Sequence, residues 1–477
     1  MSGLAEILLM RGIVVSGSDA TQNKKTDELQ SLGATISIGH NAINVGDADT
    51  VVYSSAISSD NAERIEAEQL GIRLVRRADF LGEILRDHIV IAVAGTHGKT
   101  TVTSMIASVL IEAGLDPLVL VGASVKELGG KNSRAGAGKI AVVEADEYDR
   151  SFLALGGSYI SVLTSLEAEH LDTYGDVESL KDAFVQFENQ GSAITQQASG
   201  LDLLRNGHQS SQNGFSIVSI DEPMLRELTP RLRKRIVTYG IDSQETKYRA
   251  SNLMHTAQRT RATLVRSGES SGDIELRVPG KHNMLNALAA IATADVLSIP
   301  LDITLRALKR FAGAERRFEV IREANGITVI DDYAHHPTEV RATLATTRQI
   351  YPGRRIIACF QPHTFTRTRD FAEGFGEAFA VYADVLVLLD IYPARETPIT
   401  GVNSNLIKDA AKNAGMNKIY SIAGPNKLPA LLSTILQEGD VVLTIGAGTI
   451  TEAAPVILNE LINIKMLEPA AEQESVA

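Results

Sequence analysis

The sequence predicts an α/β protein of about three domains, built on largely parallel β-sheets. The chain has 477 residues, and a domain usually takes roughly 150 residues. Strand-like and helix-like segments alternate almost throughout, which is typical of parallel strands joined by crossover helices. Hydrophobic residues make up 44% of the chain, enough to bury the cores that such sheets need.

Residues 1–87 are expected to form the first domain. Leu4, Ile7 and Leu8 lie on one helical face, so the chain is expected to begin inside a helix. A doubly wound domain usually opens with a strand and a glycine-rich turn, and neither precedes this helix. Strands are expected within 12–20, 34–40, 49–57 and 72–77, and helices that end at glycine within 24–33 and 59–71.

Residues 88–314 are expected to form the second domain. It begins with the buried strand "IVIAVAG", continues through "KIAVVEADEYD", "YISVLTSLEAEHLD" and "KRIVTYGI", and reaches the helix "NMLNALAAIATADVL". Residues 188–214 are rich in Gln, Asn, Ser and Gly, which predicts a flexible insertion. Residues 315–477 are expected to form the third domain, with strands in "ITVIDDY", "RRIIACFQPH", "DVLVLLDIY" and "DVVLTIGAG" and a disordered tail, "LEPAAEQESVA".

Composition narrows the classes of partner. A net charge of −12 argues against nucleic acid, although nucleotides need only local positive charge. The single cysteine, Cys359 in "RIIACF", excludes an internal disulfide and is expected to be a buried structural thiol rather than a nucleophile. No apolar run is long enough to span a membrane, and the start lacks the features of a signal peptide. We therefore expect a cytoplasmic protein without membrane insertion, as a monomer or homodimer.

The stretch "VAGTHGKTTVTS" resembles a phosphate-binding loop. The general pattern, G-x-x-x-x-G-K-[ST], requires a glycine where this chain has Val93. Gly95 and Gly98 still allow a tight turn close to a ligand, and the helix from Lys99 directs free N–H groups at the loop. Lys99 can reach terminal phosphates, and Thr100 can ligate Mg²⁺. The alternative is a glycine-rich turn with an exposed lysine.

Carboxylates and a histidine follow two further strands. "VVEADEYDRS" places Glu144 and nearby acids after one strand, and "SLEAEHLDTYG" places Glu167, Glu169 and His170 after another. Carboxylate oxygens suit Mg²⁺, although a solvated loop, a helix cap or a structural histidine would give the same pattern. Ligands of open parallel sheets bind at the carboxyl ends of the strands, so the three stretches support one another.

The third segment carries a run of cationic side chains. "GAERRFEV" contains Arg316 and Arg317, and "IDDYAHHPTEV" and "FQPHTFTRTRDF" add histidines and arginines after strands. In an acidic protein this run suggests an anionic substrate, and arginine suits a transferring phosphoryl group. A surface arginine pair and a solvated face remain the alternatives. The turn "GAGTI" is weak evidence for a ligand.

Seven motifs occur in the order seen in the Mur ligase family: "GTHGKTT", "EADEYD", "LEAEHLD", "GKHNMLNALAA", "GAERRFE", "DDYAHHPTEV" and "FQPHTFTRTRD". The chain resembles this family over nearly all its length, apart from the insertion and the tail. The resemblance implies a Rossmann-like domain that binds a UDP-sugar, a P-loop-type central ATPase domain and a Rossmann-like domain that binds an amino acid. The compact loop is then the family's own version of the phosphate-binding loop.

The implied activity is that of an ATP-dependent, Mg²⁺-requiring ligase of peptidoglycan synthesis. It would join L-alanine to the lactyl carboxylate of UDP-N-acetylmuramate through an acyl phosphate. The alternatives are a family member that attaches a recycled tripeptide to the same UDP-sugar, a folate-type polyglutamate ligase, and a catalytically degenerate homologue that binds ATP. The motif "FQPHTFTRTRD" resembles the alanine-adding members more closely.

The resemblance also implies roles for individual residues. Lys99 and Arg317 would hold the γ-phosphate; Thr100 and Glu144 would bind one Mg²⁺ and His170 a second. The implied catalytic residues are Lys99, His170, Arg317 and His335. The implied ATP contacts are Gly95, Thr96, His97, Gly98, Lys99, Thr100, Thr101, His282, Asn283, Arg317 and Asp332, and the implied substrate contacts are Asp19, Ser54, Ser55, Tyr333, His335, His363 and Arg367.

The sequence departs from the family pattern in four places. Because the first glycine turn is absent, we expect weak UDP-sugar binding and an upstream start, with Met1 an internal methionine. Ser165 stands where many members have Asn, and Glu169 where many have Asp, which affects the details of the metal site. Thr364 stands where some members have a further arginine.

Overall fold

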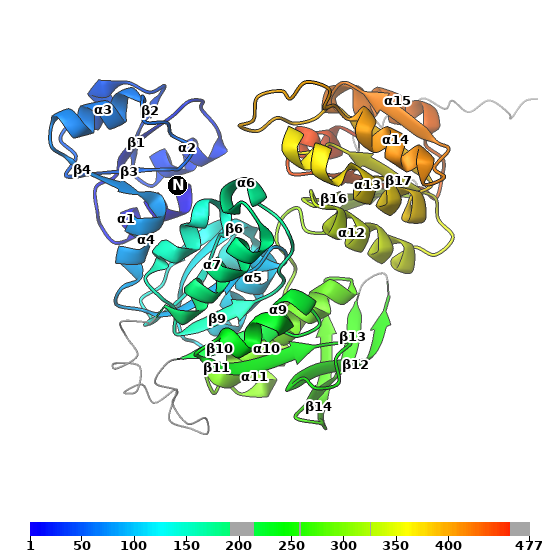
Figure 1. Ribbon diagram of the computed structural model, residues 1–477, viewed down its shortest axis with the longest axis horizontal. Coiled ribbons are helices and arrows are strands. Elements are labelled where there is room, and N and C mark those ends of the chain that lie inside the picture. Colours follow the sequence, from blue (N-terminus) through cyan, green and yellow to red (C-terminus); the bar gives the residue numbers. More distant parts are fainter. Residues whose placement is uncertain (191–213, 257–258, 325, 458–477) are drawn as a thin grey trace, which may run out of the picture. The chain divides into compact units, whose positions relative to one another are not determined.

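The computed structural model describes residues 1–190, 214–256, 259–324 and 326–457 (Figure 1). The chain divides into two compact units. The first unit contains Met1–Leu253, Arg261–Arg277 and Asn283–Ala314, and the second contains Met254–Thr260, Val278–His282 and Glu315–Ala477. The proposed domain boundaries of 1–87, 88–314 and 315–477 stay a prediction.

The start of the first unit, blue in Figure 1, opens with a helix, as the sequence predicts. Its four strands form two separate parallel pairs, β1 with β2 and β3 with β4. The elements are α1 Ser2–Met10, β1 Ser16–Asp19, α2 Lys24–Ser31, β2 Thr35–Ile38, η1 Ala42–Val45, β3 Thr50–Tyr53, α3 Ala62–Gln69, β4 Arg73–Arg76 and α4 Arg77–Leu85.

A ten-stranded sheet follows, made of β5 Ile89–Ala94, β6 Leu118–Val125, β7 Lys131–Ala135, β8 Ile140–Glu144, β9 Ile160–Leu163, β10 Phe215–Ser219, β11 Arg235–Gly240, β12 Tyr248–His255, β13 Thr260–Arg266 and β14 Glu269–Leu276. Its order is β14-β13-β12-β11-β10-β9-β5-β8-β6-β7. Each neighbouring pair in the stretch β12-β11-β10-β9-β5-β8-β6 is parallel, and β7 pairs antiparallel with β6.

Strand β5 lies inside this sheet, and all six of its residues are buried. This burial explains its continuous apolar sequence, because both faces of such a strand are covered. Leu4 and Ile7 of α1 and Leu81 and Leu85 of α4 join the same apolar core as Val90. The other helices of this unit are α5 Lys99–Glu112, α6 Leu171–Tyr174, α7 Val177–Asn189, α9 Pro223–Leu228, α10 Lys281–Val296 (which begins in the second unit) and α11 Leu301–Arg310.

The second unit is built on a six-stranded sheet in the order β15-β16-β20-β17-β18-β19. All its pairs are parallel except β15 with β16. Its elements are β15 Glu319–Ala324, β16 Ile327–Asp332, α12 Pro337–Ile350, β17 Ile356–Phe360, α13 Phe365–Tyr382, β18 Val385–Leu389, α14 Asn405–Asn413, β19 Ile419–Ile422, α15 Leu428–Ile435 and β20 Val441–Ile445.

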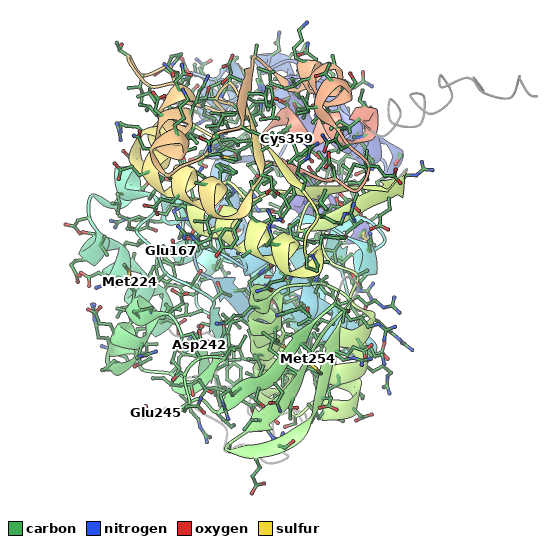
Figure 2. All side chains as sticks on the ribbon, turned by 90° about the vertical axis from the view of Figure 1, so that its right-hand side faces the viewer. Glu167, Met224, Asp242, Glu245, Met254 and Cys359 are labelled. Atoms are coloured by element: carbon green, nitrogen blue, oxygen red, sulfur yellow. The ribbon has the colours of Figure 1, made fainter. Side chains whose placement is uncertain are left out.

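Alternate residues of β17 enter different cores. Ile356, Ala358 and Phe360 pack in one apolar cluster, and Ile357 and Cys359 pack in another. Both faces of the sheet are therefore covered, which fits a parallel sheet. The thiol of Cys359, labelled in Figure 2, is fully buried, and burial raises its pKa, which confirms the expectation of a structural thiol.

The structure corrects the predicted insertion. Helix α7 continues to Asn189, and Glu188 is fully buried and hydrogen-bonded to Ser216, so 188–189 belong to the folded core. Residues 191–213 and the predicted tail lie outside the described residues. Sequence analysis did not identify several strands, among them the antiparallel strands β7 and β15. Both are edge strands and contain charged residues in place of a continuous apolar run. Within the described residues, no helix is long and apolar enough to cross a membrane.

Candidate functional site

The predicted phosphate-binding loop joins β5 to α5, as expected. Gly95 has a φ of 137°, and a β-carbon on it would lie 2.2 Å from Thr164 Oγ1 and 2.8 Å from the Ser165 nitrogen. Gly98 caps α5 with a φ of 83°. Both positions therefore require glycine, for backbone conformation and, at Gly95, also for space.

The segment after β9 supports the backbone of the loop. The His97 N–H donates to Ser165 Oγ at 2.7 Å, and the Thr96 N–H donates to the Ser165 carbonyl at 3.1 Å. In return, the Glu167 N–H donates to Thr96 Oγ1 at 2.9 Å. Because β9 pairs with β5, the segment after β9 lies beside the loop after β5 and holds its backbone.

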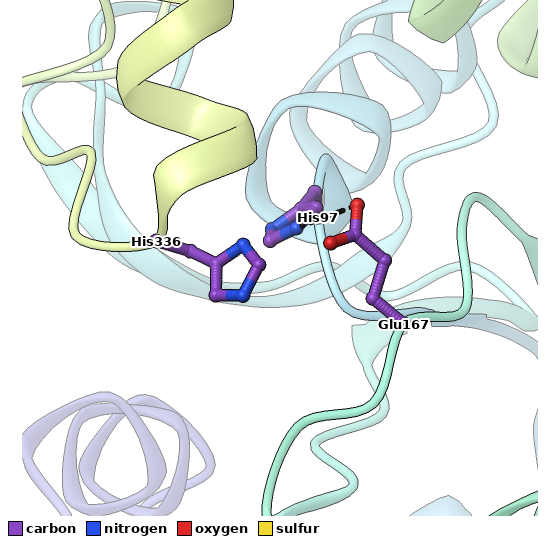
Figure 3. A group of neighbouring side chains, drawn as sticks. All are labelled: His97, Glu167 and His336. Carbon is purple, nitrogen blue, oxygen red and sulfur yellow. Dashed lines mark ion pairs between the residues drawn. The ribbon is translucent and has the colours of Figure 1, made fainter. Parts of the chain in front are cut away.

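The His97 ring lies beside Glu167. Figure 3 shows the contact, in which His97 Nε2 is 3.3 Å from Glu167 Oε1 and forms an ion pair when the imidazole is protonated. His170 follows three residues later, with a φ of 57° at the start of α6, and its ring lies 5.3 Å from that of Tyr148. A positive φ at a residue other than glycine is costly and is found most often at functional sites.

Lys99 begins α5 and turns back onto the loop. Its Nζ donates to the Gly95 carbonyl at 2.6 Å and lies 2.9 Å from both carboxylate oxygens of Glu147. Burial opposes the charge on Lys99, but the carboxylates of Glu147, Asp146 and Glu144 together outweigh burial and raise the pKa of the lysine. Lys99 is therefore a cation at neutral pH.

Carboxylates line the carboxyl end of the central strands. Glu144 ends β8, and a β-carbon on Gly122 would lie 2.6 Å from its Oε2, so the glycine leaves room for this carboxylate. One ligand atom each from Glu147, Glu169 and His170 lies within 4.8 Å of the others. The carboxylate oxygens of this group fit a hard divalent cation. Thr100 is buried in the first turn of α5, which starts at the same end of the sheet.

Helix α10 presents two asparagines. Asn283 and Asn286 are both buried, and the Asn286 amide donates to Asn283 Oδ1 at 3.3 Å. A β-carbon on Gly98 would lie 2.8 Å from Asn286 Oδ1, so Asn286 contacts the start of α5. The sequence reasoning named Asn283 and missed Asn286, although the i, i+3 spacing places both on one helical face.

In the second unit, Asp332 ends β16 and caps two backbone amides. Its Oδ2 accepts from the Phe318 N–H at 2.8 Å and its Oδ1 from the Ala334 N–H at 2.7 Å. Burial raises the pKa of Asp332 to about 6, against the opposing charge of Arg317. Burial lowers the pKa of His282 to about 4, so this imidazole is neutral at pH 7.

The two adjacent arginines have different surroundings. Arg316 Nε lies 3.2 Å from Asp331 Oδ2, and its Nη2 donates to the Gly446 carbonyl at 2.6 Å. Arg316 thereby ties the "GAGTI" turn to β16 and is a structural residue. Arg317 Nη1 lies 3.5 Å from Glu339 Oε1, and its guanidinium lies 5.2 Å from the centre of the Tyr333 ring.

The structure brings together the substrate-contact residues predicted in the second unit. The rings of Tyr333 and His335 are 5.3 Å apart, and those of His335 and His363 are 5.8 Å apart. Arg367 Nη1 lies 3.2 Å from His363 Nδ1. Sequence reasoning missed Glu339, whose carboxylate accepts from the His335 N–H at 3.0 Å. Its position in the first turn of α12 was the available signal.

The residues predicted to contact the UDP-sugar lie at the ends of strands of two separate sheets. Asp19 ends β1, and its Oδ1 accepts from the Thr21 N–H at 3.1 Å. Ser54 and Ser55 follow β3, where Ser54 Oγ accepts from the Ala56 N–H at 3.2 Å. Their role in binding stays a prediction.

Comparisons with known proteins agree along most of the chain. The chain matches "Mur ligase family, catalytic domain" over residues 1–89, "Mur ligase middle domain" over 93–196 and 205–294, and "Mur ligase, glutamate ligase domain" over 316–448. It is 44% identical to a UDP-N-acetylmuramate–L-alanine ligase of Sorangium cellulosum, over 94% of this chain and 92% of the relative. It is 42% identical to the protein of that name in Geobacter sulfurreducens, over 97% and 95%.

Solved structures show the same fold. A UDP-N-acetylmuramate–alanine ligase from Thermotoga maritima superposes with a TM-score of 0.80 at 27% identity and covers 97% of both chains. A murein peptide ligase from Psychrobacter arcticus superposes with a TM-score of 0.69 at 24% identity, over 97% of this chain and 96% of that one.

Proposed function

The chain belongs to the Mur ligase family, and we propose that it joins L-alanine to the lactyl carboxylate of UDP-N-acetylmuramate at the expense of ATP. The observation that carries the proposal is its identity of 42–44% to ligases of that name over nearly their whole length. The fold and the lysine-bearing loop at the carboxyl end of β5 support it. The reaction belongs to peptidoglycan synthesis.

The chemistry explains the residue types. A carboxylate is a poor acyl donor until its oxygen becomes a leaving group, so its oxygen attacks the γ-phosphorus and ADP leaves. The amine of L-alanine then attacks the carbonyl carbon of the acyl phosphate, loses a proton, and phosphate departs. Two anions must meet in the first step, and Lys99 and Arg317 are the cations that we assign to the transferred phosphoryl group.

We assign the remaining roles by unit. In the first unit, Thr100, Glu144 and His170 are the proposed ligands of Mg²⁺, which when bound neutralises the phosphates. Asp19, Ser54 and Ser55 are assigned to the UDP-sugar. We assign to ATP the first-unit residues Gly95, Thr96, His97, Gly98, Thr101 and Asn283 and the second-unit residues His282 and Asp332. We assign to the alanine and the reacting carboxylate Tyr333, His335, His363 and Arg367.

Phosphate release tests the proposal. We expect release that requires ATP, Mg²⁺, UDP-N-acetylmuramate and L-alanine together, measured with each omitted in turn. Lys99→Ala should lower the rate at least about 100-fold, whereas Lys24→Ala, which removes a lysine with 87% side-chain exposure, should leave it unchanged. Release with a tripeptide and not with L-alanine would identify the recycling ligase instead. ATP binding without amino-acid-dependent release would identify a degenerate homologue.

A further inference from the structure

The protein itself occupies every donor of the Lys99 ammonium. Its Nζ contacts the Gly95 carbonyl at 2.6 Å, both Glu147 carboxylate oxygens at 2.9 Å and the Thr96 carbonyl at 3.4 Å. An ammonium has three N–H donors. A phosphate oxygen can therefore bind Lys99 only after one of these contacts is released.

Glu147 is fixed in place. Its side chain is 4% exposed and that of Lys99 is 17% exposed. The Tyr174 hydroxyl donates to the Glu147 carbonyl at 2.6 Å, and the next turn contains two strained residues, Asp149 and Arg150, each with a φ of 54°. The backbone that carries Glu147 is thus held in place, and its carboxylate is buried against Lys99.

The surroundings of Lys99 are acidic. Besides Glu147, the carboxylates of Asp146 and Glu144 also stabilise its charge. One cation thus faces three carboxylates. A free nucleoside triphosphate is more negative than its complex with a divalent cation, so these carboxylates repel the free form more strongly.

We propose that Glu147 is a positioning residue that holds the Lys99 ammonium in the nucleotide-free loop and makes nucleotide binding depend on a divalent cation. When the nucleotide arrives with its cation, the γ-phosphate replaces Glu147 on Lys99, and the cation offsets the carboxylate that is left behind. When it arrives without the cation, Glu147 competes for Lys99 and repels the phosphates. The inference rests on the proposed ATP-dependent function and adds a residue to it.

The test is the dissociation constant of labelled ATP, measured by equilibrium dialysis in EDTA and in Mg²⁺. The readout is the dissociation constant in EDTA divided by the dissociation constant in Mg²⁺. A fraction of inactive protein cancels in this ratio. Glu147→Gln keeps the shape and removes the charge, so ATP should bind about tenfold more tightly in EDTA and with unchanged affinity in Mg²⁺, and the ratio should shrink by about 1.4 kcal/mol. A ratio that shrinks through weaker binding in Mg²⁺ would make Glu147 a cation ligand instead and would overturn this role. Asp146→Asn, at an exposed position, should lower the ratio less, about threefold, and provides a second variant with little risk to folding.

Two controls separate charge from packing. Glu147→Asp keeps the charge and should keep the original ratio. Glu188→Gln neutralises another buried carboxylate of the first unit, which pairs electrostatically with the buried Lys234. Glu188 bonds Ser216 near the amino end of β10, the opposite edge of the sheet, so its loss should leave the ratio unchanged.

The outcomes are distinguishable. An unchanged ratio in Glu147→Gln and Asp146→Asn, or an equal fall in Glu147→Asp or Glu188→Gln, would overturn the role of Glu147. A fall confined to the two neutralised residues beside Lys99 would establish it. The measurement needs neither UDP-N-acetylmuramate nor L-alanine, so failure of the ligase assignment would appear in phosphate release and leave this ratio intact.

Discussion

Gly95→Ala should destabilise the first unit far more than an ordinary glycine substitution. The φ of 137° at Gly95 lies in a region that L-residues rarely adopt, which costs about 1–3 kcal/mol. The new β-carbon would also lie 2.2 Å from Thr164 Oγ1 and 2.8 Å from the nitrogen and oxygen of Ser165. This segment cannot retreat, because Leu163 pairs with Ala94 across β9 and β5, so overpacking adds about 1–3 kcal/mol.

The matched control is Gly114→Ala, just beyond the other end of α5. Gly114 has a φ of 72°, but a β-carbon on it would meet no atom of the described residues within 4 Å. Its substitution should cost only the free energy of holding an alanine in the left-handed conformation, about 1–2 kcal/mol. Urea denaturation followed by circular dichroism would compare the two variants. The free energy of unfolding should fall about 1–3 kcal/mol further in Gly95→Ala, which is the cost of overpacking, and an equal loss in both would refute the steric reasoning.

Two further predictions concern the loop and the second unit. Ser165→Ala should weaken ATP binding about tenfold, because it leaves the His97 N–H without its acceptor at 2.7 Å; Ser165→Asn should retain most of the affinity, and equal loss in both would contradict this role. Asp332 has a folded-state pKa of about 6 against an ordinary 3.8. At pH values between these two, the folded state therefore binds more protons than the unfolded state. The contribution of Asp332 to the free energy of unfolding should therefore fall, by on the order of 3 kcal/mol, as pH rises from about 4 to about 6. Denaturation midpoints across this range should change less steeply in Asp332→Asn, and an unchanged slope would contradict the burial argument.

Local sequence patterns were sufficient for most of the fold. The apolar run before Gly95 predicted a buried strand, and the glycine at position 33 predicted the end of a helix, which the structure places at Ser31. Both signals are local, because periodicity and glycine conformations act within a few residues. The start of the insertion was predicted wrongly, since Glu188 looked like part of a polar segment and its buried partners, Ser216 and Lys234, come from segments farther along the chain.

The candidate functional site was likewise predicted only in part from the sequence. The sequence alone predicted which residues carry the chemistry, because a lysine after a glycine turn and carboxylates after strands have recognisable spacing. The residue pattern treated Arg316 and Arg317 alike, and only the resemblance selected Arg317. The structure gives them different partners: Arg316 is held by Asp331 and the Gly446 carbonyl, whereas Arg317 lies beside Glu339. Neighbours this far apart in the chain are set by strand order, which periodicity does not encode.

By itself, the sequence determined the α/β class and the family and predicted the phosphate-binding loop, since each depends on residues that are close together or on motifs in order. Only the tertiary structure decided that Glu147 is the partner of Lys99 and that Ser165 supports the loop. Both contacts join segments that follow different strands of one sheet. Their formation depends on which strands lie side by side, and packing across the whole sheet decides that order.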